Sequence, residues 1–203
     1  MKKVFVFVAL LLAALSSAAL FAQDGNNVYL PVAMHIPPPP FSDPIANGDF
    51  EAGLQGWSES SSNGNDIILL AADYASSPTP HSGAWLAWLG GDLNEVSVIE
   101  QSFQVPLTAT RLEFYNWLGS QEPQCSFDTM RVELQVGSSS DEIHFQELCD
   151  PLDTHSWQKV SIAINSYAGE DVTLRFIVET DGSLNSNVFI DDVAIVDTAA
   201  VNQ

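Results

Sequence analysis

Strict alternation of apolar and polar residues in short segments is the feature that most limits the fold of this chain. The two kinds of residue alternate without error over Met130–Val136, and Val172–Val178 alternates almost as regularly. A period of two places one face of a β-strand on a core and the other toward solvent. Residues 45–197 show almost no helical periodicity, so the sequence predicts an all-β domain there.

Weaker segments of the same kind extend the pattern, and turn-forming pairs such as Gly90-Gly91 and Asp181-Gly182 separate them. The weaker strands are expected at Ala84–Leu89, Val96–Val105, Arg111–Leu118, Glu142–Leu148, Trp157–Ile164 and Val188–Val196. About nine to eleven short antiparallel strands at this spacing predict a jelly-roll β-sandwich over residues 45–197.

The N-terminus has the three-part layout of a secretory signal peptide. Lys2 and Lys3 precede an apolar run shorter than the roughly 20 residues of a membrane span. We expect residues 1–22 to be removed by cleavage after Ala22, with cleavage after Ala19 or an uncleaved anchor as alternatives. The mature chain is then secreted and extracellular, with no membrane insertion.

A proline-rich linker is expected between the signal peptide and the sandwich, over residues 23–44. It contains the four-proline run Pro37–Pro40, which favours an extended polyproline II spacer. Residues 198–203 are expected to form a C-terminal tail.

The charge balance limits the partners. Asp and Glu total 26 against 6 Lys and Arg, for a formal net charge of −20. Nucleic acids and anionic lipid surfaces need a basic footprint, so both are excluded as partners. Cys125 and Cys149 are the only cysteines, and in an oxidising compartment they are expected to form a disulfide. The alternative is two buried thiols.

Motifs at both ends of the domain carry a family resemblance. Asn47–Glu51 with Gly56-Trp57 at the start, and Phe189–Val193 at the end, resemble the galactose-binding-like jelly rolls, which include many carbohydrate-binding modules. The middle is similar to the MAM-like β-sandwich modules appended to secreted bacterial hydrolases. The matching stretches are His81–Gly83, Trp88–Gly91, Gln101–Phe103, Trp157–Val160, Tyr167–Gly169 and Val172–Phe176. The resemblance implies an accessory, non-catalytic module, although no neighbouring enzyme domain accompanies it here.

Alternation through the last expected strand also predicts a buried carboxylate. It places Phe189, Asp191, Val193 and Ile195 on one face. If the apolar members face the core, Asp191 points inward, where a carboxylate is costly unless it is paired or bound to a metal. Signal cleavage would leave only four basic residues, so a metal is the better partner.

The resemblance implies that this metal is a structural calcium, with Glu51 and Asp191 as side-chain ligands and Asp49 and Asp192 as further candidates. The alternative is a solvated acidic edge. A second, weaker calcium set comprises Asp92, Glu95, Glu122 and Asp128, with Asp181 as a further candidate. The alternative is that the residues of this set only provide negative surface charge that keeps the protein soluble.

Exposed aromatic rings are the candidates for a ligand platform. Tyr115 and Trp117 share one face of their strand, and Trp88 is a third candidate. The alternative is that these rings cover the second sheet or a long loop. The resemblance implies that Trp57 and Trp157 lie in the core, where members of the family bury a ring.

No catalytic apparatus is evident. The sequence has no Gly-x-Ser-x-Gly elbow, no His-Glu-x-x-His motif and no phosphate-binding glycine loop. It therefore predicts a secreted, non-catalytic module with structural calcium that binds an extracellular polysaccharide or cell-surface glycan. The alternative is a structural or adhesion protein that contacts other proteins, and a small glycoside hydrolase or lyase is a remote third reading.

Overall fold

The computed structural model describes residues 23–24, 27–28, 41–75 and 77–197. The predicted signal peptide, the proline run and the C-terminal tail lie outside them. The chain divides into two compact units, residues 1–39 and 40–203. In the first, β1 (Gln23–Asp24) and β2 (Asn27–Val28) pair antiparallel. Within the described residues, no helix is long and apolar enough to cross a membrane.

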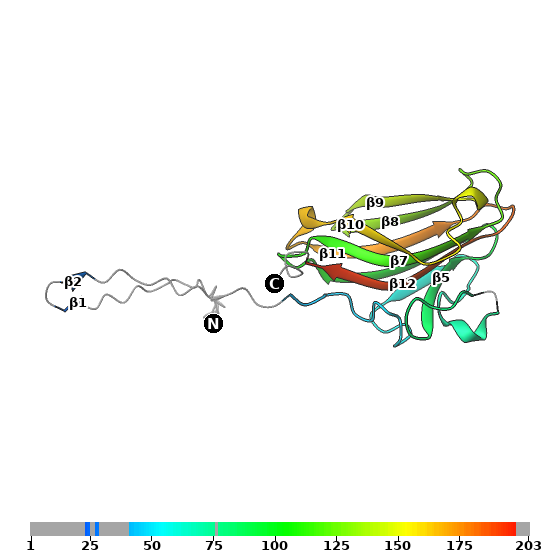
Figure 1. Cartoon of the computed structure of the whole chain (residues 1–203). Coiled ribbons are helices and arrows are strands. Elements are labelled where there is room, and N and C mark those ends of the chain that lie inside the picture. The colour runs from blue at the N-terminus through cyan, green and yellow to red at the C-terminus, as the bar shows by residue number, and fades with distance from the viewer. Residues whose placement is uncertain (1–22, 25–26, 29–40, 76, 198–203) are drawn as a thin grey trace, which may run out of the picture. The chain divides into compact units, whose positions relative to one another are not determined.

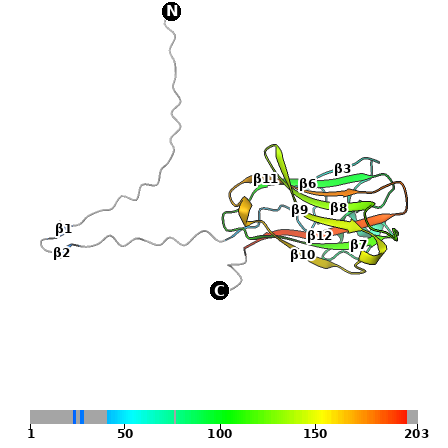
Figure 2. The same cartoon turned by 90° about the horizontal axis from the view of Figure 1, so that it is seen from above.

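The second unit is an antiparallel β-sandwich, as the alternation predicts. Its described part contains two five-stranded sheets, of order β10-β7-β12-β5-β4 (sheet one) and β3-β6-β11-β8-β9 (sheet two) (Figure 1, Figure 2). Sheet one contains β4 (Ile68–Leu70), β5 (Trp85–Gly90), β7 (Arg111–Ser120), β10 (Gln158–Ala163) and β12 (Ser186–Val196). Sheet two contains β3 (Ser58–Ser61), β6 (Val96–Gln104), β8 (Asp128–Val136), β9 (Ser139–Leu148) and β11 (Asp171–Glu179). Three 3-10 turns lie at Ala71–Asp73, Asp150–Leu152 and Asn165–Tyr167.

The core lies between the two sheets and is built from the alternating positions that the sequence predicts. In β7 every second residue is buried, and the intervening residues form the outer face of the strand. Phe114 of β7 packs edge-on against Phe176 of β11, with ring centroids 5.0 Å apart. Trp57 is buried in this core, as expected. The sandwich also includes residues expected in the linker, because Phe41 packs against the core and the Asp43 carboxylate accepts the Ile195 N–H.

A register shift in β12 corrects the alternation assumed for the last strand. The pairing of β12 with β7 is irregular between Asp191 and Ala194, and Asp192 has a φ of 49°. An extra residue in one strand reverses the face on which the following residues lie. Val193 and Ile195 therefore face the core, while Phe189 packs in a cluster on the outer face of sheet one. The premise that Phe189 and Asp191 share the core face with them is wrong, because Val188 and Ile190 take the core positions before the bulge.

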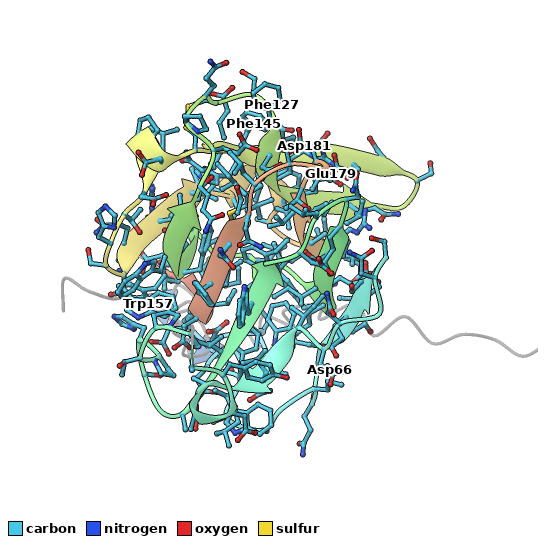
Figure 3. The ribbon with its side chains drawn as sticks, turned by 90° about the vertical axis from the view of Figure 1, so that its right-hand side faces the viewer. Asp66, Phe127, Phe145, Trp157, Glu179 and Asp181 are labelled. Carbon is cyan, nitrogen blue, oxygen red and sulfur yellow. A yellow bond between two sulfur atoms is a disulfide. The ribbon has the colours of Figure 1, made fainter. Side chains whose placement is uncertain are left out.

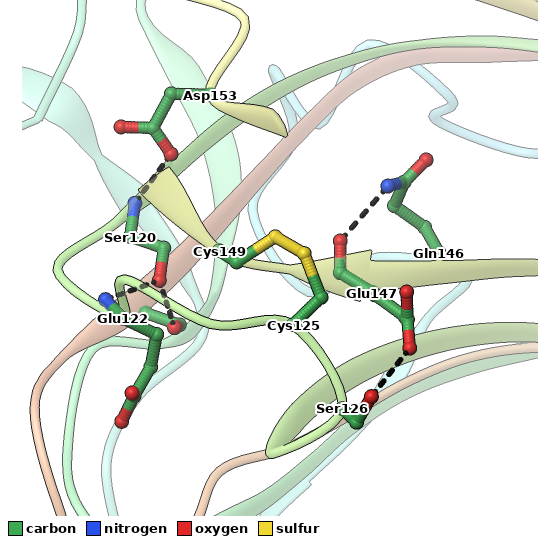
Figure 4. The surroundings of a disulfide bond; sticks show 9 residues. Ser120, Glu122, Cys125, Ser126, Gln146, Glu147, Cys149 and Asp153 are labelled. Atoms are coloured by element: carbon green, nitrogen blue, oxygen red, sulfur yellow. Dashed lines mark hydrogen bonds between the residues drawn. A yellow bond between two sulfur atoms is a disulfide. The ribbon is translucent and has the colours of Figure 1, made fainter. Parts of the chain in front are cut away.

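Cys125 and Cys149 form a disulfide, with their Cα atoms 5.0 Å apart (Figure 4). The bond ties the loop that leads into β8 to the end of β9. In the same region the Asp150 N–H donates to the Glu122 carbonyl oxygen at 2.7 Å. The loop before β8 is thus fixed at one end of the sandwich.

Removing the disulfide should destabilise the domain. The bond joins residues 24 positions apart, and the chain-entropy estimate for such a loop is about 3–4 kcal/mol. We expect the Cys125→Ser/Cys149→Ser variant to lose that much free energy of unfolding, measured by urea denaturation. Wild-type protein under reducing conditions is the control and should show a similar loss. A loss below about 1 kcal/mol would contradict the estimate.

Acid should destabilise the domain through His144. Its ring faces Phe114, its buried Nε2 has no hydrogen-bond partner, and desolvation holds its pKa below 6.5 while Glu142 opposes the shift. A depressed histidine pKa stabilises the fold above the unfolded pKa, and this stability is lost as the pH falls. The wild type should therefore lose stability relative to His144→Leu between pH 7 and pH 5, measured by urea denaturation at each pH. Free energies of unfolding that change in parallel with pH for the two proteins would contradict the prediction.

Candidate functional site

The outer face of sheet one carries an aromatic groove. In the strand pairing, Phe189 of β12 lies opposite Trp117 of β7 on one side and Trp88 of β5 on the other. The three rings thus form a row across neighbouring strands. The hollow above this row has a volume of about 520 Å³. It is lined by Ser77, Pro78, Trp88, Gly91, Trp117, Gly119, Gln121, Asn185, Asn187 and Phe189.

Side-chain amides form one wall of the aromatic groove and are linked to one another. The Asn187 carboxamide accepts a hydrogen bond from the Trp88 indole N–H at 2.9 Å and donates to Asn185 Oδ1 at 2.6 Å. Asn185 in turn donates to the Gly91 carbonyl oxygen at 2.6 Å. These contacts fix the orientation of the amides next to the rings.

Gly119 keeps the floor of the groove open. It is the penultimate residue of β7 and pairs with Asn187 of β12, a position at which glycine weakens strand pairing. A Cβ built on Gly119 meets no atom within 4 Å, and its φ is not positive. Neither packing nor backbone geometry therefore requires glycine here. A larger side chain would occupy the groove.

A second hollow lies on the other side of Trp88. Its volume is about 240 Å³, and Asn65, Asp66, Leu69, Tyr74, Trp88, Gly90, Gly91 and Asp92 line it. The Tyr74 ring meets Trp88 edge-on, with centroids 5.9 Å apart. Trp88 and Gly91 line both hollows, so the two adjoin at these residues.

Tyr115 lies on the same sheet face as Trp117 but does not line the groove. It stacks on His81 with ring centroids 3.5 Å apart. Trp157, labelled in Figure 3, is half-buried on this outer face and meets Trp117 edge-on. The prediction of a core position for Trp157 is wrong, because Trp157 directly precedes β10, the edge strand of sheet one, and its indole N–H donates to the Thr79 carbonyl oxygen.

The first acidic set lies around the segment 81–85. Asp191 is fully buried beneath this segment and accepts the Ser82 N–H at 3.1 Å. Desolvation by burial raises its pKa to about 7, with a smaller contribution from Asp192. Glu51 accepts the Ala84 and Trp85 N–H groups at 2.7 and 2.8 Å. Asp191 and Glu51 thus bind neighbouring peptide groups of one segment.

The other two members of this set have different contacts. Asp192 pairs with His81 and accepts the Ser82 hydroxyl at 2.7 Å, and Asp49 is exposed and accepts the Glu51 N–H at 3.4 Å. In the described part of the chain, no group of three or more His, Cys, Asp or Glu side chains could hold a metal ion as it stands.

The residues of the second acidic set lie in two separate places in the structure. Asp92 and Glu95 are linked to the β3–β4 connection through Asn63 and Asn65. Glu122 and Asp128 lie with Asp181 around the turn 181–183. Glu95, Glu122 and Asp128 are all buried, which a purely solvating role does not explain.

The outer face of sheet two is ionic. Arg131 pairs with Glu179 at 2.7 Å, and Arg175 lies between Glu100 at 3.0 Å and Glu133 at 3.6 Å. The two faces of the sandwich therefore differ in chemistry: one is aromatic and amide-lined, and the other is covered by ion pairs.

Sequence reasoning missed Asn185, Asn187, Gln121 and Phe189. Asparagines in Ser183–Asn187 read as turn residues, and a polar ladder beside aromatic rings becomes visible only once the pairing of β12 is known. Trp88 and Trp85 lie on opposite faces of β5, since Trp85 packs against the core and Trp88 against the outer cluster.

Solved structures share this fold. One is the carbohydrate-binding module TmCBM61 in complex with β-1,4-galactotriose, with a TM-score of 0.57, 16% identity and coverage of 77% of this chain and 99% of that one. Another is the K3 cleaved adhesin domain of Lys-gingipain from Porphyromonas gingivalis W83, with a TM-score of 0.54, 14% identity and coverage of 76% and 99%. A third comes from work on promiscuous carbohydrate-binding modules of the β-sandwich superfamily, with a TM-score of 0.51, 14% identity and coverage of 73% and 60%.

These similarities confirm the predicted resemblance to carbohydrate-binding jelly-roll modules at the level of the fold. No protein-family model matches the sequence, and no curated protein matches it.

Proposed function

We propose that this protein is a secreted, non-catalytic module that binds an uncharged extracellular glycan in the aromatic groove. The observation that carries the proposal is the juxtaposition of Trp88 and Trp117 with the fixed amides of Asn185 and Asn187 in one hollow. Aromatic faces pack against the apolar faces of sugar rings, and carboxamides donate to and accept from hydroxyl groups. The shared fold with a galactotriose-binding module supports this assignment.

The charge of the protein selects the class of glycan. A net charge of −20 repels anionic polysaccharides at long range. The residues that line the aromatic groove include no Lys, Arg or His that would attract a uronate or sulfate group. An uncharged polysaccharide or oligosaccharide chain is therefore the expected ligand.

The same lining supports binding without catalysis. Glycoside hydrolysis in most enzymes uses two carboxyl groups that flank the scissile bond. None of the residues lining the aromatic groove is an Asp or a Glu. A sugar held there would lie on rings and amides, and no carboxyl group belongs to the lining of this hollow.

We also propose a structural calcium at Glu51 and Asp191. Two observations support this proposal. Asp191 is fully buried, and a Cβ on Gly83 would lie 2.2 Å from the Glu51 carboxyl carbon, so only glycine leaves room for that carboxylate. Bound calcium would stabilise the ionised form of Asp191 and join the start of the domain to β12. Carboxylate and backbone oxygens are its usual ligands.

Filling the groove should separate binding from folding. We expect Gly119→Val to fold at least as stably as wild type, since valine suits a strand interior better than glycine by about 0.5–1 kcal/mol. It should lose retention in affinity electrophoresis on an uncharged polysaccharide, because its side chain occupies the floor of the groove.

Trp117→Ala should lose retention as well, by removal of a stacking face. Phe145→Ala is the matched control, since Phe145 is an exposed ring on sheet two (Figure 3) and its removal should leave retention unchanged. Retention that survives both groove variants would refute the groove as the binding site. A folded wild type that binds none of a panel of polysaccharides would favour protein contact instead.

Chelation should destabilise the protein through the Glu51 and Asp191 site. We expect a lower melting temperature in EDTA than in calcium, and Asp191→Asn should lose a large part of that difference because it removes one ionised ligand. Asp171→Asn, which removes an exposed carboxylate from β11, is the control. Equal melting temperatures of the wild type in calcium and in EDTA would contradict the proposal.

A further inference from the structure

Asp128 is a buried carboxylate, and only one of its two oxygens has a hydrogen-bond partner. Its exposed fraction is 0%, and it stands at the first position of β8 on the face toward the core. Oδ1 accepts the Asp181 N–H at 2.7 Å, whereas Oδ2 has no hydrogen-bond partner. An unpaired buried oxygen of an ionisable group is costly, and native proteins satisfy nearly all such groups.

Two further carboxylates meet Asp128 around the turn 181–183. Glu122 is 3% exposed and accepts the Ser183 hydroxyl at 3.2 Å through Oε1. The same hydroxyl lies 2.9 Å from Asp181 Oδ1. Figure 3 shows Asp181 at the end of the sandwich that faces the viewer. Asp181 is half-buried and Ser183 is exposed, so the turn is open to solvent.

No basic side chain neutralises these carboxylates. Between residues 41 and 197 the chain has four basic residues, and each has its contacts elsewhere. Lys159 pairs with Glu113, Arg131 with Glu179, Arg175 with Glu100, and Arg111 donates to Ser161. Two buried carboxylates and a third at the surface therefore share one place without a protein cation.

We propose that this place is a cation site, occupied by a hard divalent ion of the calcium class and centred on Asp128 Oδ2. The available donors are all oxygens, from Glu122, Asp128, Asp181 and Ser183, and oxygen donors select calcium over softer metals. Because three acidic side chains do not already converge on one point, backbone carbonyl and water oxygens complete the shell, as calcium allows.

The site adjoins the rim of the aromatic groove. Gln121 and Asn185 both line the groove, and the Gln121 N–H donates to the Asn185 carbonyl oxygen at 2.8 Å. Glu122 follows Gln121 directly, and Ser183 lies two residues before Asn185. The disulfide at Cys125 holds the same loop (Figure 4). The cation thereby joins the two segments that form this rim, whatever ligand the groove takes.

Calcium titration of the full chain, stripped with chelator, tests the site by isothermal titration calorimetry. We expect Asp128→Asn to bind one ion fewer than wild type, and Asp171→Asn to bind the wild-type number. Asp191→Asn should retain the Asp128 ion, which separates this site from the one at Glu51. Wild-type stoichiometry in Asp128→Asn, or a wild type that binds no calcium, would overturn the proposal.

Thermal unfolding provides a second readout that a merely structural aspartate would not give. In EDTA, Asp128→Asn should be at least as stable as wild type, because it replaces an uncompensated buried charge with a neutral group. In calcium, the wild type should be more stable than Asp128→Asn. Glu122→Gln should behave in the same way, so the test survives if one variant fails to fold. Variants less stable than wild type by the same amount in both media would overturn the proposal.

Discussion

The pairing of β12 with β5 on one side and β7 on the other is the interaction on which the site depends. It sets Phe189 between Trp88 and Trp117, which makes three rings from distant parts of the sequence into one row. Two residues earlier in the same strand, it sets Asn187 between Gly90 and Gly119, where the small neighbours leave a hollow. Two residues after Phe189, the bulge that begins at Asp191 returns Val193 to the core. One strand thus supplies amide, ring and carboxylate in succession.

The shortage of basic residues is a second constraint. Arg131 and Arg175 are committed to the carboxylates on the outer face of sheet two, where exposed pairs contribute little to stability. The buried carboxylates Asp191 and Asp128 lie elsewhere. Burial without a protein counter-ion raises the pKa of Asp191 to about 7 and leaves Asp128 with an unpaired oxygen. The external cation that we propose at each place would offset these costs, and donor sets made only of oxygen atoms favour calcium over softer metals.

Much of the fold was predictable because alternation is a local signal. The strands from β5 to β12 appear where the pattern places them, and the disulfide joins the only two cysteines. The candidate site was predictable only in part. Trp88 and Trp117 were identified as exposed rings, but a one-residue bulge reversed the face of Phe189, and alternation alone contains no sign of it. The partners of Asn187 depend on strand order, which is a long-range property. The MAM-like part of the resemblance and both calcium sites stay predictions.

Two glycines line the aromatic groove, and they differ in what requires them. At Gly91 a Cβ would lie 2.8 Å from Trp88 Nε1, with φ at 83°, so glycine there is a condition for the position of the indole ring. Gly119 differs, because open space surrounds it and its backbone is that of an ordinary strand residue. Its cost to the strand has no compensation in the fold. The proposed ligand would need this space, so filling the space is a sharper test of the proposed function than removing a ring.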